Sequence, residues 1–298
     1  MKAVFSHYFL DKRVRLPIQS PRRCRFFRRK GADMNRDTTK ISRGFTLIEL
    51  LVVIAIIALL LSIMMPSLQF VMMQAEGLSC TSNNRSLVQA WYAYQNENDG
   101  KLCGGNTYDD EQWLGPPRDE NGNPSQQTLG DEIRGFEAGT LWPYLESEEI
   151  YHCPGDKYTK ALEMGRGYRS TSIQGDMNGE TGGVTKMGEI TSPGAKYVFI
   201  ENVDPRGWNM GSWIMSGAGS NNPSLIDPIA IFHADWSTLG FADGHAEKHR
   251  WISQGLRDWA HHATDIGTAC FSFTFIPNTD EEREDVNFLA KGYIPGRH

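Results

Sequence analysis

The sequence predicts an α+β fold in which one long N-terminal helix precedes a domain with antiparallel strands. An apolar run at 45–65 is followed by a one-sided helical pattern at 66–98. Further along, 196–201 is rich in β-branched and aromatic residues, which are typical of a strand. Two alternating runs separated by a turn at 231–251 indicate a hairpin.

The apolar run predicts a transmembrane segment. From Phe45 to Met65 there are 21 residues, and Glu49 is the only charged one. At about 1.5 Å per residue, this length spans a hydrocarbon layer of roughly 30 Å. A buried helix of a globular core would show a polar face, and this segment shows none.

Charge is divided unevenly along the chain. Residues 1–44 contain 13 Lys and Arg against 3 Asp and Glu, whereas the rest contains 17 basic and 33 acidic residues. The positive-inside rule therefore places the basic leader in the cytoplasm. We expect a single pass through the cytoplasmic membrane, with 99–298 forming an extracytoplasmic domain. Its acidic charge argues against nucleic-acid binding, which needs a basic surface.

Beyond Met65 the pattern changes to that of an amphipathic helix. Val71, Ala75 and Leu78 follow the spacing i, i+4, i+7, and so do Leu87, Trp91 and Tyr94. We therefore expect one helix over 45–98 that is apolar all round at first and one-sided later. Pro66 is expected to bend it.

The residues around the start of the apolar run resemble the type IV prepilin signature. Gly44 ends the basic leader, and Phe45-Thr-Leu-Ile-Glu49 opens the apolar run. A secretory signal peptide would instead have a shorter apolar region with its cleavage site on the far side. The resemblance implies that a prepilin peptidase cleaves after Gly44 and methylates the new amino group of Phe45. It also implies that Glu49 pairs with the terminal amine of a neighbouring subunit during assembly.

The leader is longer than pilin leaders usually are. Met34 opens an eleven-residue basic segment of ordinary length, so we expect translation to start there. The alternative to the prepilin interpretation is a plain signal anchor in which Glu49 is tolerated near the headgroups.

The resemblance implies a pilin-like architecture in which the second half of the helix packs on a mainly antiparallel sheet. Its implied function is that of a pilin or pseudopilin subunit of a pilus-like filament or a type II secretion pseudopilus. The implied partners are prepilin peptidase, other subunits and the cytoplasmic membrane. The alternative is a membrane- or surface-anchored binding module that uses the prepilin signal for export. Trp208 and Trp213 could then stack on glycans, although a position in the core is the favoured interpretation of both.

The hairpin region contains a second motif. Asp243-Gly244 suits a type I′ turn, which requires positive φ at both central residues. His233 precedes this pair by nine intervening residues, a spacing that resembles the H-X9-DG C-terminal domain of large prepilin-like proteins. Tyr151–Asp156 and Cys80 fit the same resemblance. We expect His233 to form a hydrogen bond near the turn and to order the hairpin.

Four of the five cysteines follow the leader. Cys80, Cys103, Cys153 and Cys270 permit disulfides outside the cytoplasm, with three connectivities that the sequence does not rank. Free or buried thiols are the equal alternative.

Two metals are candidates for the hairpin region. His245 and His249 would share a strand face about 13 Å apart, too far to share one zinc ion. Major pseudopilins that resemble this chain bind calcium through carboxylates and carbonyls of a C-terminal loop. Asp235, Asp243 and Glu201 are therefore candidate ligands of a structural calcium ion.

The sequence contains no motif for catalysis. A Gly-rich phosphate loop, a Gly-x-Ser-x-Gly elbow and a His-Glu-x-x-His zinc motif are all missing. We therefore expect a protein that is not an enzyme and has no catalytic residues.

Overall fold

The computed structural model describes residues 45–126, 128–157, 167–203, 211–265 and 273–293. The chain divides into two compact units, 1–54 and 55–298. Four residues named above, Met34, Gly44, Trp208 and Cys270, lie outside the described residues.

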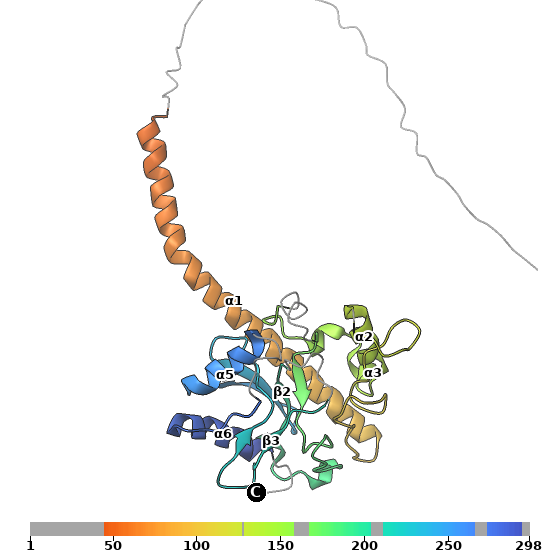
Figure 1. Ribbon diagram of the computed structural model, residues 1–298. Helices are drawn as coiled ribbons and strands as arrows, with labels where there is room; N and C mark the ends of the chain where they lie inside the picture. Colours follow the sequence, from red (N-terminus) through yellow and green to blue (C-terminus); the bar gives the residue numbers. More distant parts are fainter. Residues whose placement is uncertain (1–44, 127, 158–166, 204–210, 266–272, 294–298) are drawn as a thin grey trace, which may run out of the picture. The chain divides into compact units, whose positions relative to one another are not determined.

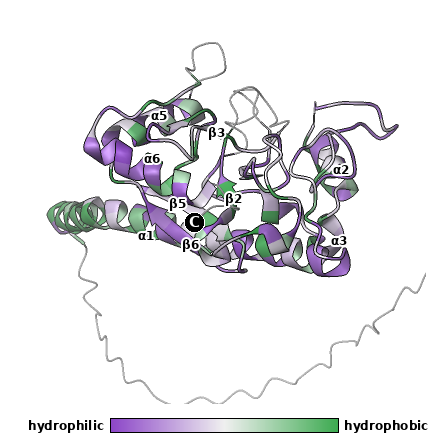
Figure 2. Ribbon diagram, turned by 90° about the horizontal axis from the view of Figure 1, so that it is seen from below, coloured by the Kyte–Doolittle hydropathy of each residue, from purple (hydrophilic) through white to green (hydrophobic). Residues whose placement is uncertain are grey.

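The first element is the long helix α1, Leu47–Glu97 (Figure 1). It is the one described helix that is long and apolar enough to cross a membrane. Its residues are exposed up to Met72, and the start of α1 is coloured hydrophobic in Figure 2. Pro66 lies inside α1, which continues through it. The long N-terminal helix expected from the sequence is therefore present.

The second part of α1 is buried on one side. The spacing i, i+3, i+4 connects its buried positions, which place one stripe against the domain. These are Gly77, Cys80, Asn84, Leu87, Val88, Ala90, Trp91 and Gln95. This part of α1 is therefore an integral part of the domain core. Of the two stripes expected from the sequence, Leu87 and Trp91 are buried, whereas Val71, Ala75 and Leu78 are exposed, because α1 meets the domain only from Gly77 onward.

The centre of the domain is a four-stranded antiparallel sheet with the order β1-β2-β5-β6. Its strands are β1 Thr171–Ile173, β2 Tyr197–Glu201, β5 Trp236–Phe241 and β6 Ala246–Arg250. The mainly antiparallel sheet and the α+β class agree with the sequence prediction. The strand expected at 196–201 corresponds to β2.

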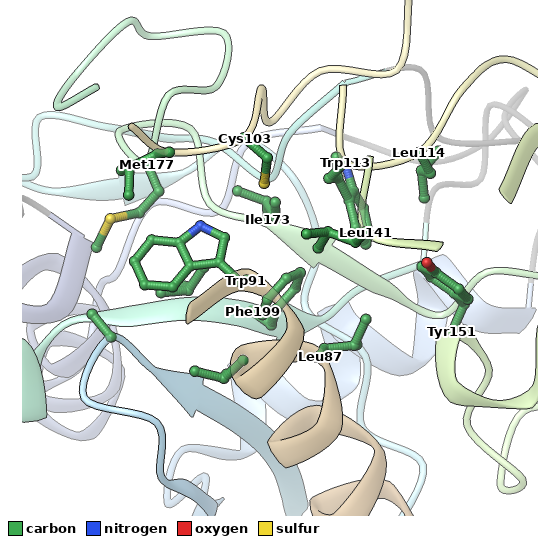
Figure 3. Packing of buried hydrophobic residues seen from close by; sticks show 14 of the residues in the cluster. Leu87, Trp91, Cys103, Trp113, Leu114, Leu141, Tyr151, Ile173, Met177 and Phe199 are labelled. Atoms are coloured by element: carbon green, nitrogen blue, oxygen red, sulfur yellow. The ribbon is translucent and has the colours of Figure 1, made fainter. Parts of the chain in front are cut away.

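Helices cover both faces of this sheet. On one face, Phe199 of β2 packs with Leu87 and Trp91 of α1, as Figure 3 shows. On the other face, Leu239 of β5 belongs to a second cluster with residues of two C-terminal helices. These are α5 Gln254–Asp265 and α6 Asp280–Tyr293.

Gly240 lets α1 approach β5 closely. A Cβ atom added to Gly240 would clash with the Val88 side chain and lie 3.2 Å from the carbonyl oxygen of Asn84. The Asn84 side chain in turn donates a hydrogen bond to the Thr238 hydroxyl on the same strand. The helix therefore rests directly on the strand backbone at this point.

The hairpin β5–β6 is present, but its turn differs from the predicted type I′ turn. Gly244 has φ +97°, whereas Asp243 is not among the described residues with positive φ. The Gly244 amide donates to the Phe241 carbonyl, and the Phe241 amide donates to the His245 carbonyl. This is the three-residue loop in which a type I turn is followed by a left-handed glycine. The prediction was wrong because the ladder ends one residue earlier, so only the glycine needs positive φ.

The remaining elements are short and surround the core. They are α2 Leu129–Ala138, α3 Trp142–Leu145, β3 Met215–Ser216, β4 Ser224–Leu225 and the 3-10 turns η1 Glu148–Tyr151, η2 Met187–Glu189 and η3 Pro193–Ala195. Between α2 and α3 the chain leaves the helical conformation at Gly139 and Thr140.

Candidate functional site

The first candidate site is the start of α1, where Thr46 and Glu49 cap the helix. The Thr46 amide and hydroxyl both donate to Glu49 Oε2 at 2.9 Å, and the Glu49 amide donates to the Thr46 hydroxyl at 3.2 Å. This reciprocal pair is a capping box, which satisfies amide groups that have no partner inside the helix. In a membrane such groups would otherwise be costly to bury.

The apolar surface around this cap has no covering within the described chain. Phe45 is 70% exposed and Leu47 86% exposed, and Glu49 is exposed beside them. Among the described residues the whole apolar window of α1 is unburied, as expected of a helix that lies in a lipid layer or packs on other helices.

The second candidate site is a buried group of four side chains, which we call the sulfur cluster. It consists of Cys80, Cys153, Glu201 and His233, and one ligand atom from each lies within 4.8 Å of all the others. Each of these residues is at most 3% exposed. Four separate segments supply them, namely α1, the loop after η1, the end of β2 and the segment before β5.

Short contacts connect the members of the sulfur cluster. The two sulfur atoms of Cys80 and Cys153 are 2.7 Å apart, and Cys153 Sγ is 3.1 Å from His233 Nε2. His233 Nε2 is also 3.5 Å from Glu201 Oε1. The three described cysteines are free thiols in this structure.

The surrounding backbone fixes these side chains. Glu201 Oε2 accepts a hydrogen bond from the Thr238 amide at 2.9 Å, which directs Oε1 toward His233. Gly77 and Gly155 lie against the His233 ring, because a Cβ at Gly77 would be 3.3 Å from Cγ and one at Gly155 3.0 Å from Cε1. Both glycines therefore make room for the imidazole.

Two buried polar atoms of the sulfur cluster have no hydrogen bond within the described residues. They are Glu201 Oε1, which faces the other ligand atoms, and His233 Nδ1. Leaving such atoms unpaired in a protein interior costs roughly 1–3 kcal/mol each. The cluster is therefore incompletely satisfied by protein groups alone.

The electrostatics of the sulfur cluster follow from burial and proximity. Burial raises the pKa of Cys153 well above its usual range, and the adjacent Cys80 and Glu201 act in the same direction. The hydrogen bond between Cys80 and Cys153 lowers the pKa of Cys80, but burial and Glu201 outweigh it. Burial alone would lower the pKa of His233, whereas its contacts with Cys153 and Glu201 raise it to about 10.

The carboxylates named as calcium ligands do not come together. Asp235 lies before β5, within 4.0 Å of the guanidinium groups of Arg250 and Arg257, and Asp243 follows β5 and contacts His245. A strand of six residues separates them by about 20 Å. Glu201 belongs to the sulfur cluster instead. Among the described residues, these three carboxylates therefore form no common oxygen cage.

The histidines of the hairpin have separate environments, as their placement on a strand implies. His245 stacks on Phe241 with ring centroids 4.4 Å apart, and its Nδ1 is 2.5 Å from Asp243 Oδ1. His249 stacks on Phe288 at 3.6 Å. The His233 side chain contacts two other members of the sulfur cluster, Cys153 and Glu201. These contacts take the place of the hydrogen bond that was expected near the turn.

The cysteines also separate into two environments. Cys103 is buried in the hydrophobic cluster near Ile173 and Met177, as Figure 3 shows, away from the other two. Cys80 and Cys153 are the pair that the fold brings together. Trp213 is fully buried and contacts the rings of Tyr197 and Tyr293, which supports its core position.

Sequence reasoning missed two features of these sites. The capping box was readable as Thr-x-x-Glu before an apolar run. The sulfur cluster had weaker signals, since its four members were each noted separately and no spacing connects them. Their convergence is tertiary, because the separations are 73 residues between the cysteines and 80 from Cys153 to His233.

Comparison with known proteins identifies the first site. Residues 39–65 match the family model of the prokaryotic N-terminal methylation motif, which covers Gly44, Phe45 and Glu49. The comparisons with curated proteins and with solved structures give no match. The chain therefore carries the N-terminal methylation motif of prepilins on a single long apolar helix, which supports a type IV pilin-like, membrane-anchored protein.

Proposed function

We propose that this protein is a pilin or pseudopilin subunit that assembles into a pilus-like filament or a type II secretion pseudopilus. The observation that carries the proposal is the methylation motif at the start of an apolar helix that the described part of the chain leaves uncovered. In the membrane, lipid covers this helix. In a filament, the corresponding helices of neighbouring subunits replace the lipid.

Glu49 provides the register of assembly in this proposal. A carboxylate inside an apolar segment is costly and usually has a partner. Before assembly that partner is Thr46 of the same chain. Cleavage after Gly44 would create a terminal amine at Phe45, and the amine of a neighbouring subunit would then attract the Glu49 carboxylate.

The orientation follows from the charge distribution. The basic leader would stay in the cytoplasm and the acidic domain would lie outside it. We propose a structural rather than catalytic role for the domain, with prepilin peptidase and other subunits as partners. The glycan-binding alternative finds no support in Trp213, whose side chain is fully buried.

Intact mass and N-terminal sequencing of the membrane-extracted protein test the proposal. We expect a chain that begins with N-methylated phenylalanine at position 45. A Gly44→Leu variant is the matched control, because a bulky residue at the cleavage position should leave the leader in place. A wild-type chain that keeps its leader would contradict the filament assignment and favour an anchored binding module.

A further inference from the structure

We propose that the sulfur cluster is a structural zinc site, in which Cys80, Cys153, His233 and Glu201 hold one Zn²⁺ ion. The site lies inside the domain and is separate from the methylation motif. It adds a metal ion to a protein for which the prepilin motif implies none.

The donor set has the chemistry that zinc prefers. Two sulfurs, one imidazole nitrogen and one carboxylate oxygen are the ligand types of tetrahedral zinc sites. Calcium and magnesium prefer sites made only of oxygen atoms, so the two thiols argue against them.

The positions of the four atoms suit a single small ion. All lie within 4.8 Å of one another. With zinc bonds of about 2.0–2.3 Å, ligand atoms of a tetrahedral site lie roughly 3.3–3.8 Å apart. The contacts of His233 Nε2 at 3.1 and 3.5 Å are close to this range, and the two sulfurs at 2.7 Å need to separate by about 1 Å.

The buried carboxylate oxygen is a second, independent indication of a ligand. Glu201 is 1% exposed and fixed by the Thr238 amide, and its Oε1 faces the cluster, 3.5 Å from His233 Nε2 and without a hydrogen bond among the described residues. A buried carboxylate requires a compensating cation or donor. A zinc ion would supply that charge and would also bind the thiols as thiolates.

A disulfide between Cys80 and Cys153 would explain the placement of fewer of the four side chains than a zinc ion does. It would use only the sulfurs and would leave Glu201 Oε1 facing His233 alone. The carboxylate and the imidazole would then pair only with each other. Metal binding uses all four side chains.

A pocket lies beside the two segments that carry the cysteines of the sulfur cluster. It is lined by Ser79, Asn83, Glu149, His152, Pro154 and Tyr168. Ser79 precedes one cysteine of the cluster, and His152 and Pro154 flank the other.

Four protein ligands leave no position for a substrate, so the role of the ion is structural. Cys80 belongs to α1, Glu201 to β2, and His233 to the segment that enters β5. One ion would therefore connect the helix to two neighbouring strands of the sheet and to the loop after η1. Removing it should loosen the contact between α1 and the sheet.

Metal analysis of the full-length protein in detergent tests the proposal. We expect about one zinc ion per chain after purification without chelator. After chelation and reloading with Co²⁺, we expect the visible absorption bands of tetrahedral cobalt with thiolate ligands. Cys153→Ser and Glu201→Gln should each lose the stoichiometric metal or weaken its binding at least about tenfold. Glu201→Gln keeps the size of the side chain and an oxygen for the Thr238 amide, so it should still fold.

Two matched controls distinguish the site from general effects of substitution. Cys103→Ser replaces a buried thiol outside the sulfur cluster, and His245→Ala replaces an exposed histidine of the same hairpin. Both should keep one metal ion per chain and the cobalt spectrum.

Thiol alkylation under denaturing conditions decides between metal and disulfide. With a metal site, Cys80 and Cys153 react with the alkylating reagent without prior reduction once the ion is removed. Alkylation of the two cysteines only after reduction, with no bound metal, would overturn the proposal and establish a disulfide. Free thiols that bind neither Zn²⁺ nor Co²⁺ would overturn it as well.

Discussion

At the residue scale, Glu49 has two separable properties, its charge and its capping hydrogen bonds. Glutamine at the third helical position can still accept the Thr46 hydrogen bonds but carries no charge. We therefore expect Glu49→Gln and Glu49→Ala both to insert into the membrane and both to be lost from filaments. Shearing and immunoblotting of filament and membrane fractions measure this.

Ser62→Ala is the matched control for Glu49. Ser62 is also polar and lies in the apolar part of α1, but its hydroxyl bonds only to the Leu59 carbonyl within the helix. This variant should assemble normally. If Glu49→Gln assembled like the wild type, capping rather than charge pairing would be the role of Glu49.

Glu132 of α2 is expected to make stability depend on pH. Burial raises the pKa of Glu132 to about 7, although the Tyr168 amide, which donates to it at 2.6 Å, and Arg169 partly oppose this. The folded state therefore binds a proton that the unfolded state, with a pKa near 4.5, has released. The free energy of unfolding should fall as pH rises from about 4.5 to 7, by at most about 3 kcal/mol.

Denaturant titrations of wild type and Glu132→Gln across this pH range measure the effect. The Glu132→Gln substitution should make the free energy of unfolding depend less on pH. Glu137→Gln, an exposed position on the same helix, should leave it as in the wild type. Equal slopes for wild type and Glu132→Gln would show that another group is responsible.

The residues of both sites were visible in the sequence to different degrees. Gly44, Phe45 and Glu49 act as a contiguous motif, so adjacency alone identified them. His233 and Cys153 were noted for their spacing and surroundings, and Glu201 as a carboxylate, but each was assigned a different role. Their common site depends on strand order and helix placement, which no local pattern encodes.

At the scale of elements, the contact between α1 and β5 depends on the absence of a side chain at Gly240. An alanine there would push against Val88 and the backbone of Asn84. We expect Gly240→Ala to lower the free energy of unfolding by about 1–3 kcal/mol, as overpacking does. Thermal or denaturant unfolding of the detergent-solubilised protein measures this.

Gly188→Ala is the control for this substitution. Gly188 lies in η2, and a Cβ there would meet no atom within 4 Å. The free energy of unfolding of the Gly188→Ala variant should differ from that of the wild type by no more than about 0.5 kcal/mol. A similar loss in both variants would mean that the close approach at Gly240 does not matter.

The long helix and the central strand were predicted, but the stripe at Val71, Ala75 and Leu78 is exposed, and the turns were not predicted. Helix α1 and strand β2 follow from hydrophobic pattern and composition. The type of the β5–β6 turn was predicted wrongly because Asp-Gly suits both two-residue and three-residue hairpin loops. The register of the hydrogen bonds between β5 and β6 decides between the two. The short strands β3 and β4 have two residues each and no pattern that could reveal them.

At the scale of the whole molecule, burial along α1 indicates where a soluble fragment can begin. Every residue of α1 before Gly77 is exposed or only partly buried. A fragment of residues 70–298 should therefore fold without detergent and melt cooperatively. A fragment of residues 87–298 would lose the Asn84 hydrogen bond and the buried contacts of Cys80, which should cost at least about 2 kcal/mol.

Circular dichroism and size-exclusion chromatography compare the two fragments. The longer one should be a compact, soluble protein, and the shorter one should melt at a lower temperature. If both behaved alike, the second part of α1 would contribute little to the domain.

The members of the sulfur cluster lie far apart in the sequence, and this separation determines at what stage of folding the two thiols become protected from oxidation. Contacts across 73 and 80 residues close late in folding, because long loops must form first. Until His233 and Glu201 arrive, Cys80 and Cys153 are accessible to any oxidant around the chain. The final state of the two sulfurs is then a competition in time between oxidation and folding, and a slowly folding variant would be trapped in the oxidised form.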